Sequence, residues 1–399
     1  MRLAAIARLP RRAGRYAWHT WKHARAAARK HKISTFRIVR EQVALKRANG
    51  LSVEEYYRYG LDAPAVPWEE KMTYLGADRI RALWTVFTPE RYQHYFKNKF
   101  IFKHFFSSMG FPVAKHYGIL DPVYGYTVTG EPFKTPADLA AWMSASDVQD
   151  PVFKPMESAE GRMVLVMKGR QKGDPSRFVS ASGEKYTPER IFAFISDDAN
   201  LREAYPPTEY ARPIRTILVE QRLHQHPALK EVAPHTLCCA RLVTVTTLDG
   251  RVEIVERAMK LTLSDQGMDN VIQGSVAVAI DMESGVLGAG RLKTDPFQCR
   301  RTHFPDSSIK FTGFQLPLWE EAKDLAVRAA LAFPHAHSVG WDIAFTENGP
   351  FLVEGNASWG AFQRTCRTGL WQGAYRETVE RLLAQQGKKW PCVPPRLHN

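Results

Sequence analysis

Three stretches of the sequence have the pattern of antiparallel β-hairpins, and they constrain the fold more than any other feature. In each, two apolar runs flank a short polar turn, at 249–250, 283–285 and 347–349. Turns that contain Asp-Gly, or a glycine after polar residues, favour the tight connections of antiparallel strands. A helical pattern over 316–333 separates the second hairpin from the third. Hairpins with separated helices predict an α+β fold rather than a doubly wound parallel sheet.

Three helix starts share one form, Thr-Pro with an acid in the first turn, at 88–90, 135–138 and 187–189. Threonine caps the first turn, proline fits the first helical position, and the acid interacts favourably with the helix dipole. The first of these starts predicts one helix that runs to Gly110. The segment 215–223 has the apolar pattern of a strand.

The basic residues are concentrated at the N-terminus. The chain has 55 Lys and Arg against 41 Asp and Glu, and its first fifty residues hold 14 of those cations and one acid, Glu41. The rest of the chain is nearly neutral, so we expect no nucleic-acid partner. Residues 1–32 carry Trp18 and Trp21 among the cations. This segment fits a helix on an anionic membrane surface or a helix packed on the protein with its charges solvated. A nucleic-acid-binding segment or an organelle transit peptide is the less favoured alternative.

Several signatures of other classes are absent from the sequence. It contains no GxGxxG, GxxxxGK[ST], HExxH or GxSxG pattern, which disfavours dinucleotide-dependent, P-loop, zinc-peptidase and α/β-hydrolase enzymes. The five cysteines form no CxxC pair, so we expect neither a zinc site nor a disulfide framework. No apolar run reaches the roughly 18 residues that cross a bilayer. We therefore expect a cytoplasmic protein, either free or peripheral at the inner face of the membrane.

The last hairpin brings oxygen donors together. A three-residue loop at 347–349 would place Asp342 opposite Glu354, with Asn356 two residues further along the same face. A two-residue loop would turn Asp342 to the other face. Opposed carboxylates destabilise a sheet unless something neutralises them, and Mg²⁺ prefers such oxygens. The spacing predicts a Mg²⁺ site, and the alternative is a solvated hairpin end.

Cations on other segments are candidates for phosphate binding. Lys154 ends a short apolar run before a polar turn whose backbone N–H groups can hold oxygens. Arg241 lies within an apolar strand pattern, and Lys260 follows another. Each position alone is more typical of an ion-pair partner or a surface cation. Several cations near two acids favour a site that handles phosphoryl charge.

In order, these segments resemble the ATP-grasp superfamily, and more narrowly the sugar-transfer associated ATP-grasp proteins, which are relatives of glutamate-ligase-like enzymes. The resemblance runs from about Lys97 to about Gln363. Its segments are NKFIFKHFFSSMGFPVAKHYGI, VFKPMESAEG, ILVEQRLHQHPAL, PHTLCCARLVTV, MDNVIQGSVAVAIDMESG, HFPDSSIKFTGFQLP and VGWDIAFTENGPFLVEGN. Most are weak alone, but their order and the closing GWD and ExN elements are specific.

The resemblance implies an ATP-grasp fold in which two α+β lobes clamp ATP. A basic helical region over 1–85 would precede an ATP-grasp domain over 86–399, with an ATP lobe at about 150–225 and a central and C-terminal lobe at about 226–390. It also implies a role for each matching residue. The ATP contacts would be Lys99, Lys154, Ser158, Glu220, Gln221, Leu223 and His226; the catalytic cations Arg241 and Lys260; the Mg²⁺ ligands Asp342, Glu354 and Asn356; and the substrate-side residues Asp269 and Asn270.

Three features depart from the family pattern. Cys238 and Cys239 stand where Asn and Thr are usual, on the substrate side. The turn at 157–161 is poor in glycine and has two acids, which are unfavourable near a triphosphate unless they point outward. Lys260 stands where Arg is common, and a Lys cannot form a bidentate pair.

The activity implied by the resemblance is ATP- and Mg²⁺-dependent ligation of a carboxylate to an amine through an acyl phosphate. The substrates would be small molecules, and the product a modified sugar or metabolite of cell-surface polysaccharide or secondary-metabolite biosynthesis. Two alternatives remain open. One is an ATP-dependent phosphotransferase, and the other is a membrane-surface binding protein with a degenerate ATP site.

Overall fold

The computed structural model describes residues 8–157, 162–197, 216–263, 275–292, 300–304 and 307–390. The chain divides into two compact units. The helical unit is Met1–Phe87, Thr247–Asp249 and Ala361–Asn399, and the sheet unit is Thr88–Thr246 and Gly250–Gly360. This division groups 361–399 with the N-terminal helices, where the sequence analysis grouped them with the ATP-grasp domain. Within the described residues, no helix is both long enough and apolar enough to cross a membrane.

The helical unit has its own core. Its helices are α2 (Arg8–His31), α3 (Thr35–Asn49), α4 (Val53–Arg58), α5 (Trp68–Lys71), α6 (Ala77–Phe87), α13 (Gln363–Cys366) and α14 (Gly373–Gln385). Ala24, Ala27 and Ala28 of α2 are buried in one cluster with Ile38 and Leu45 of α3. The basic N-terminal segment therefore includes a helix that packs on the protein, which is the structural alternative considered for it.

The first sheet of the sheet unit has seven strands in the order β2-β1-β7-β3-β4-β5-β6. Their bounds are β1 (His116–Leu120), β2 (Tyr126–Thr127), β3 (Pro151–Pro155), β4 (Leu165–Gln171), β5 (Asp174–Ser180), β6 (Lys185–Tyr186) and β7 (Ile217–Gln221). Helices α9 (Pro136–Ala145) and α10 (Pro188–Ser196) share its apolar core, for instance through Leu139 and Ile191 against Phe153.

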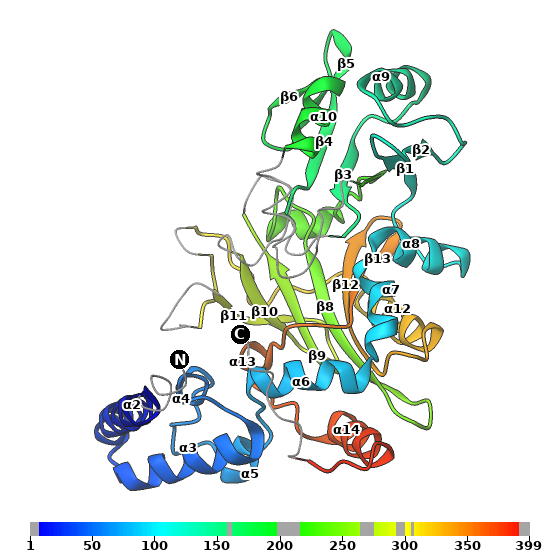
Figure 1. Cartoon of the computed structure of the whole chain (residues 1–399). Coiled ribbons are helices and arrows are strands. Elements are labelled where there is room, and N and C mark those ends of the chain that lie inside the picture. The colour runs from blue at the N-terminus through cyan, green and yellow to red at the C-terminus, as the bar shows by residue number, and fades with distance from the viewer. Residues whose placement is uncertain are drawn as a thin grey trace. The chain divides into compact units, whose positions relative to one another are not determined.

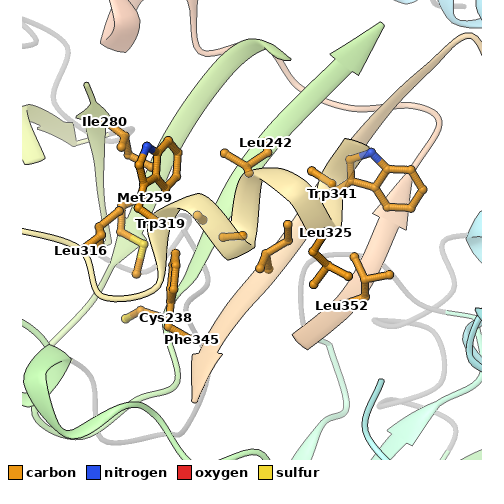
Figure 2. Close-up of a cluster of buried hydrophobic side chains, with 14 of the residues drawn as sticks. Cys238, Leu242, Met259, Ile280, Leu316, Trp319, Leu325, Trp341, Phe345 and Leu352 are labelled. Atoms are coloured by element: carbon orange, nitrogen blue, oxygen red, sulfur yellow. The ribbon is translucent and has the colours of Figure 1, made fainter. Parts of the chain in front are cut away.

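The second sheet has six strands in the order β11-β10-β9-β8-β12-β13. Their bounds are β8 (Cys239–Thr246), β9 (Val252–Leu261), β10 (Val276–Ile280), β11 (Leu287–Leu292), β12 (Ser338–Thr346) and β13 (Gly349–Asn356). Figure 2 shows α12 (Trp319–Ala332) lying over this sheet, with Trp319 and Leu325 near side chains of β8, β9 and β12. Helices α7 (Glu90–Lys97) and α8 (Lys99–Ser108) contact β13 at the edge (Figure 1).

The three predicted hairpins are confirmed as β8–β9, β10–β11 and β12–β13. All pairs of labelled strands in the described part of the chain are antiparallel, so the α+β prediction is also confirmed. These two sheets carry most of the predicted site residues that the structure describes, namely Lys154, Glu220, Gln221, Arg241, Lys260, Asp342, Glu354 and Asn356.

The predicted helix starts are confirmed in two cases and wrong in one. Thr135 caps α9 and Thr187 caps α10 through their side chains. The helix predicted from residue 88 to Gly110 is instead two helices, α7 and α8, and Thr88 does not cap the first of them. Asn98 separates them because its side chain accepts the backbone N–H groups of residues 100 and 101.

Candidate active site

The register of β12 and β13 places Asp342 opposite Glu354, as expected, but by a different route. The predicted three-residue loop was wrong, since Thr346 pairs with Gly349 across a two-residue turn. Between Ile343 and Asp342 the register shifts by one residue, which leaves Val353 as a β-bulge on β13. The extra residue in the bulge compensates for the shorter turn. Asp342 therefore keeps the partner that the longer loop would have given it.

Asp342 is buried and is bound by two cations, one from the adjacent strand β8 and one from β9, the strand beyond it. Arg241 pairs with it in the register of β8 and β12 and donates to both carboxylate oxygens, with Nε–Oδ1 at 2.6 Å and Nη2–Oδ2 at 2.9 Å. Lys260 of β9 approaches Oδ2 with its Nζ at 3.2 Å. Burial raises the pKa of Asp342, but Arg241 and Lys260 outweigh it and hold the pKa well below its usual range. This carboxylate is ionised at neutral pH.

Glu354 and Asn356 complete the donor set. Asn356 donates from Nδ2 to Glu354 Oε1 at 3.1 Å and to the carbonyl of Gly340 at 3.4 Å. Its amide nitrogen is thus engaged within the hairpin, and its carbonyl oxygen is the remaining acceptor. Two carboxylates and one amide oxygen are ligands that Mg²⁺ accepts, with waters and phosphates in the other positions. The chemistry of the residues present therefore fits this ion.

A second group of charges lies on the seven-stranded sheet. Glu220 of β7 is buried and its carboxylate contacts two ammonium groups. Lys154 of β3 is 2.6 Å from Oε1, and Lys103 of α8 is 2.9 Å from Oε2. Burial raises the pKa of Glu220, and the two lysines more than reverse this effect. Glu220 was predicted as an ATP contact, and its side chain contacts Lys154, which is a candidate phosphate-binding residue.

Lys103 was missed by the sequence analysis. It lies on the buried face of α8 with Phe102 and Phe106, one turn after Lys99. Burial lowers the pKa of Lys103 to about 8, against the attraction of Glu220. A lysine on the apolar face of a helix was the available signal, because such a lysine needs an ionic partner when it is buried.

Lys99 links the two groups of charges. Its backbone N–H donates to the carbonyl of Met156 at 2.9 Å, which joins the start of α8 to the segment after β3. Burial lowers the pKa of Lys99 to about 8, and the charges of Glu354 and Glu220 oppose this while that of Lys154 adds to it. The pKa of the Lys99 side chain thus depends on acids from both sheets.

Glu157 is one of the two acids of the turn at 157–161, and its side chain is engaged within the protein. It is buried, and its Oε1 accepts a hydrogen bond from Asn98 Nδ2 at 2.9 Å. This acid is therefore held by the residue that separates α7 from α8. Ser158, Asp269 and Asn270 lie outside the described residues.

The end of β7 and the segment that follows it make backbone contacts with the residue before β1 and with β12. The backbone N–H of Gln221 donates to Lys115 at 2.7 Å, and that of His226 donates to Phe345 of β12 at 2.8 Å. His226 also caps the short helix η1 (Pro227–Glu231) by accepting the N–H of Ala228 at its Nδ1. Leu223 is half-buried in the irregular stretch between them.

Cys238 and Cys239, which stand where the family pattern usually has Asn and Thr, are both buried in the interior.

Trp359, at the end of the sheet unit, is buried against Gly340 and donates from Nε1 to Ser338 Oγ at 3.1 Å. An added Cβ on Gly340 would lie 2.7 Å from Trp359 Cβ and 3.1 Å from Arg241 Cδ. The tryptophan therefore packs next to the side chain that binds Asp342.

Comparison with protein families matches residues 80–372 to the family described as sugar-transfer associated ATP-grasp. The chain belongs to this family, and the expected ATP-grasp fold is confirmed. No curated protein matches the chain.

The solved structures that the chain matches are distant from it in sequence. A biotin carboxylase from Campylobacter jejuni has 9% identity and a TM-score of 0.39, and the match covers 72% of this chain and 46% of that one. D-alanyl-alanine synthetase A from Vibrio cholerae has 12% identity and a TM-score of 0.34, with 74% and 62% covered. The ATP-grasp ligase PsnB, complexed with minimal precursor, has 14% identity and a TM-score of 0.32, with 75% and 64% covered. The chain thus spans less than two thirds of each of these chains.

Proposed function

We propose that the protein is an ATP- and Mg²⁺-dependent ligase that joins a carboxylate to an amine through an acyl phosphate. The observation that carries this proposal is the cluster around Asp342. A buried carboxylate with two bound cations, beside a second carboxylate and an amide, suits a site where phosphoryl charge is transferred. In this reaction the substrate carboxylate attacks the γ-phosphorus and ADP leaves. The amine then attacks the acyl carbon, and phosphate leaves.

The cations of the site would hold the reacting groups and offset their charge. Lys99 and Lys154 would contact the phosphates, and Glu220 would keep Lys154 in place through their 2.6 Å ion pair. Arg241 and Lys260 would face the transferred phosphoryl group, anchored by Asp342. Mg²⁺ on Asp342, Glu354 and Asn356 would neutralise negative charge on the phosphates.

We infer the substrate class from the family description, which names only an association with sugar transfer. The family's description as sugar-transfer associated supports a role in the modification of a sugar or small metabolite in a biosynthetic pathway. Both substrates would be small molecules, one with a free carboxylate and one with an amine.

The donor set can be tested by a charge-removing substitution that keeps shape. Glu354→Gln should lower ADP formation by about 100-fold or more, since a transition-state charge contact is lost. Glu347→Gln, an exposed acid in the turn of the same hairpin, is the matched control and should retain wild-type turnover. Unchanged turnover in Glu354→Gln, with an unchanged melting temperature, would exclude this donor set.

The reaction type needs a product assay. Panels of carboxylates and amines should be screened by phosphate release, and active pairs analysed by mass spectrometry. An amide whose formation matches the phosphate released supports ligation. A stable phosphorylated product that forms with or without amine would instead identify a phosphotransferase.

A further inference from the structure

Helix α2 has a basic side opposite the side that packs on the helical unit. Thr20, Ala24, Ala27 and Ala28 are buried, at the spacing of one helix face. Lys22, Arg25 and Arg29 follow each other at spacings of three and four residues, and all three are exposed. In the sequence, Arg11, Arg15 and Trp18 continue the same spacing toward the N-terminus.

Helix α3 has a related exposed side in which cations alternate with apolar residues. Ile38, Leu45 and the other buried positions form one face. On the opposite face lie four residues at spacings of four, three and four: Phe36, Arg40, Val43 and Arg47. Phe36 is 74% exposed and Val43 is 42% exposed. Large apolar side chains in such a regular exposed row indicate a surface that contacts something apolar.

The exposed sides of the two helices meet at a ring contact and contain no acid. Trp21 of α2, itself 41% exposed, contacts Phe36 edge-on with ring centroids 5.4 Å apart. Between Arg8 and Asn49 the acid is Glu41, which is buried and bound by Lys71, Tyr56 and Arg37. Helices α2 and α3 lie side by side (Figure 1). Their exposed sides thus form one surface, the two-helix face, with exposed cations and exposed apolar side chains.

We propose that the two-helix face binds the anionic surface of a lipid membrane. Cations near such a surface are attracted to its phosphate groups, each contributing about 1 kcal/mol, or roughly a fivefold change in partition coefficient. Phe36, Val43 and Trp21 enter the boundary between headgroups and acyl chains, where aromatic and aliphatic side chains are favourable. The buried alanine face keeps α2 on the protein, so the surface is presented by a folded unit rather than by a free arm.

A membrane accounts for this surface better than a nucleic acid does. Nucleic acids bind cations equally well, but Val43 and the phenyl ring of Phe36 on one helical row offer no hydrogen bond to a base or a phosphate. Alternating arginine with exposed apolar residues instead matches a layer that has charge at its surface and hydrocarbon beneath it.

The charge contribution can be measured by co-sedimentation of the full-length protein with vesicles. Wild-type protein should bind vesicles of phosphatidylcholine with phosphatidylglycerol, and bind them less as salt is raised. Arg40→Gln/Arg47→Gln removes two cations and should lower the partition coefficient about 25-fold at low salt, or about fivefold for each cation. Arg328→Gln/Arg381→Gln removes the same charge from exposed positions on α12 and α14 and should bind as wild type does.

The apolar contribution has a separate test. Phe36→Ser should reduce the binding that persists at physiological salt, because that part depends on insertion rather than on charge. Phe36→Ser and Arg40→Gln/Arg47→Gln both lie outside the candidate active site. ATP turnover in solution should therefore stay at the wild-type level in both variants. Melting temperatures near that of the wild type would show that the variants remain folded.

Three results would overturn the proposal. The first is equal binding of wild-type protein to anionic and to neutral vesicles, or to neither. The second is an equal loss of binding in the Arg328→Gln/Arg381→Gln control, which would attribute binding to total charge. The third is binding to duplex or single-stranded DNA without binding to vesicles, which would assign the face to a nucleic acid.

Discussion

Two buried carboxylates, Glu220 and Asp342, hold the charged residues of the candidate site in place. Each contacts two cations, and in each the cations outweigh the effect of burial on the pKa. Removing one partner of a buried ion pair is costly because the other charge remains desolvated. Such acids therefore restrict the positions of the cations that contact them. The cations are Lys103 and Lys154 for the first, and Arg241 and Lys260 for the second.

Replacement of Glu220 should be strongly destabilising. Glu220→Gln leaves Lys103 and Lys154 buried without their carboxylate, and we expect a loss of about 3–5 kcal/mol in the free energy of unfolding. Glu253→Gln removes an exposed acid paired with Arg251 and should cost at most about 1 kcal/mol. Urea unfolding of both variants measures the difference. Similar small losses in the two would show that the buried pairs contribute little.

The pKa of Lys103 predicts a rise in stability at alkaline pH. Burial lowers the pKa to about 8 in the folded protein, against an ordinary value of 10.5. Between these values the unfolded chain binds more protons than the folded one, so the free energy of unfolding rises with pH across this window. Below pH 8 the buried ammonium is charged and its desolvation is a cost.

Urea unfolding at steps across this window tests the effect. Lys103→Met should lose much of the rise, and the remainder would come from Lys99, whose pKa is also about 8. Lys115→Met, at an exposed position near α8, should keep the wild-type rise. A wild-type curve with the same slope as that of Lys103→Met would contradict the assignment.

At the scale of elements, the β12–β13 hairpin and the chain beside it determine where the donor set lies. With the two-residue turn alone, Asp342 and Glu354 would lie on different faces of the sheet. The bulge at Val353 returns them to the same face as a pair. Next to the hairpin, Trp359 packs on Gly340 because that residue has no side chain. The close approach links the backbone of β12 with the side chain of Arg241.

A methyl group at Gly340 should disturb this packing. Gly340→Ala places a Cβ 2.7 Å from Trp359 Cβ and 3.1 Å from Arg241 Cδ, so we expect a loss of about 1–3 kcal/mol and lower ADP formation. Gly288→Ala on β11 is the control, since its Cβ would meet Ala279 at an ordinary 3.6 Å. Thermal unfolding and turnover should separate the two variants. Equal behaviour would mean that Trp359 moves aside freely.

At the scale of the whole molecule, the chain contains two compact units with separate apolar cores. The helical unit is centred on α2 and α3, and the sheet unit on α12 and its six-stranded sheet. The candidate ATP residues that the structure describes all belong to the sheet unit. Two units of this kind need not unfold in one cooperative step.

Calorimetry should therefore resolve two transitions, and Mg-ATP should raise the one that belongs to the sheet unit. At about 100 times the dissociation constant, the ligand adds roughly 2.7 kcal/mol to the unit that binds it. Lys71→Met, which breaks the buried pair with Glu41, should lower the other transition. A single transition that shifts as a whole would contradict this assignment. No shift with Mg-ATP would favour a degenerate ATP site.

Local chemistry determined what could be predicted from the sequence. Alternating apolar runs, glycine-containing turns and threonine caps act within a few residues, and they led to the hairpins, to α9 and α10, and to the α+β class. The order of the segments led to the family. The pairing of Asp342 with Glu354 was also predicted, but from a loop that is one residue too long.

The tertiary structure decided the rest, because the features concerned depend on residues that are distant in the sequence. The burial of Lys103 is explained by its ion pair with Glu220. The position of Trp359 is explained by its contacts with Gly340 and Ser338. The bulge at Val353 reflects how β13 fits against β12 and the adjoining helices, which no local pattern encodes. Likewise, the periodicity of the N-terminal segment allowed a helix, but only packing decided which side is buried. That choice leaves the cations and Phe36 exposed.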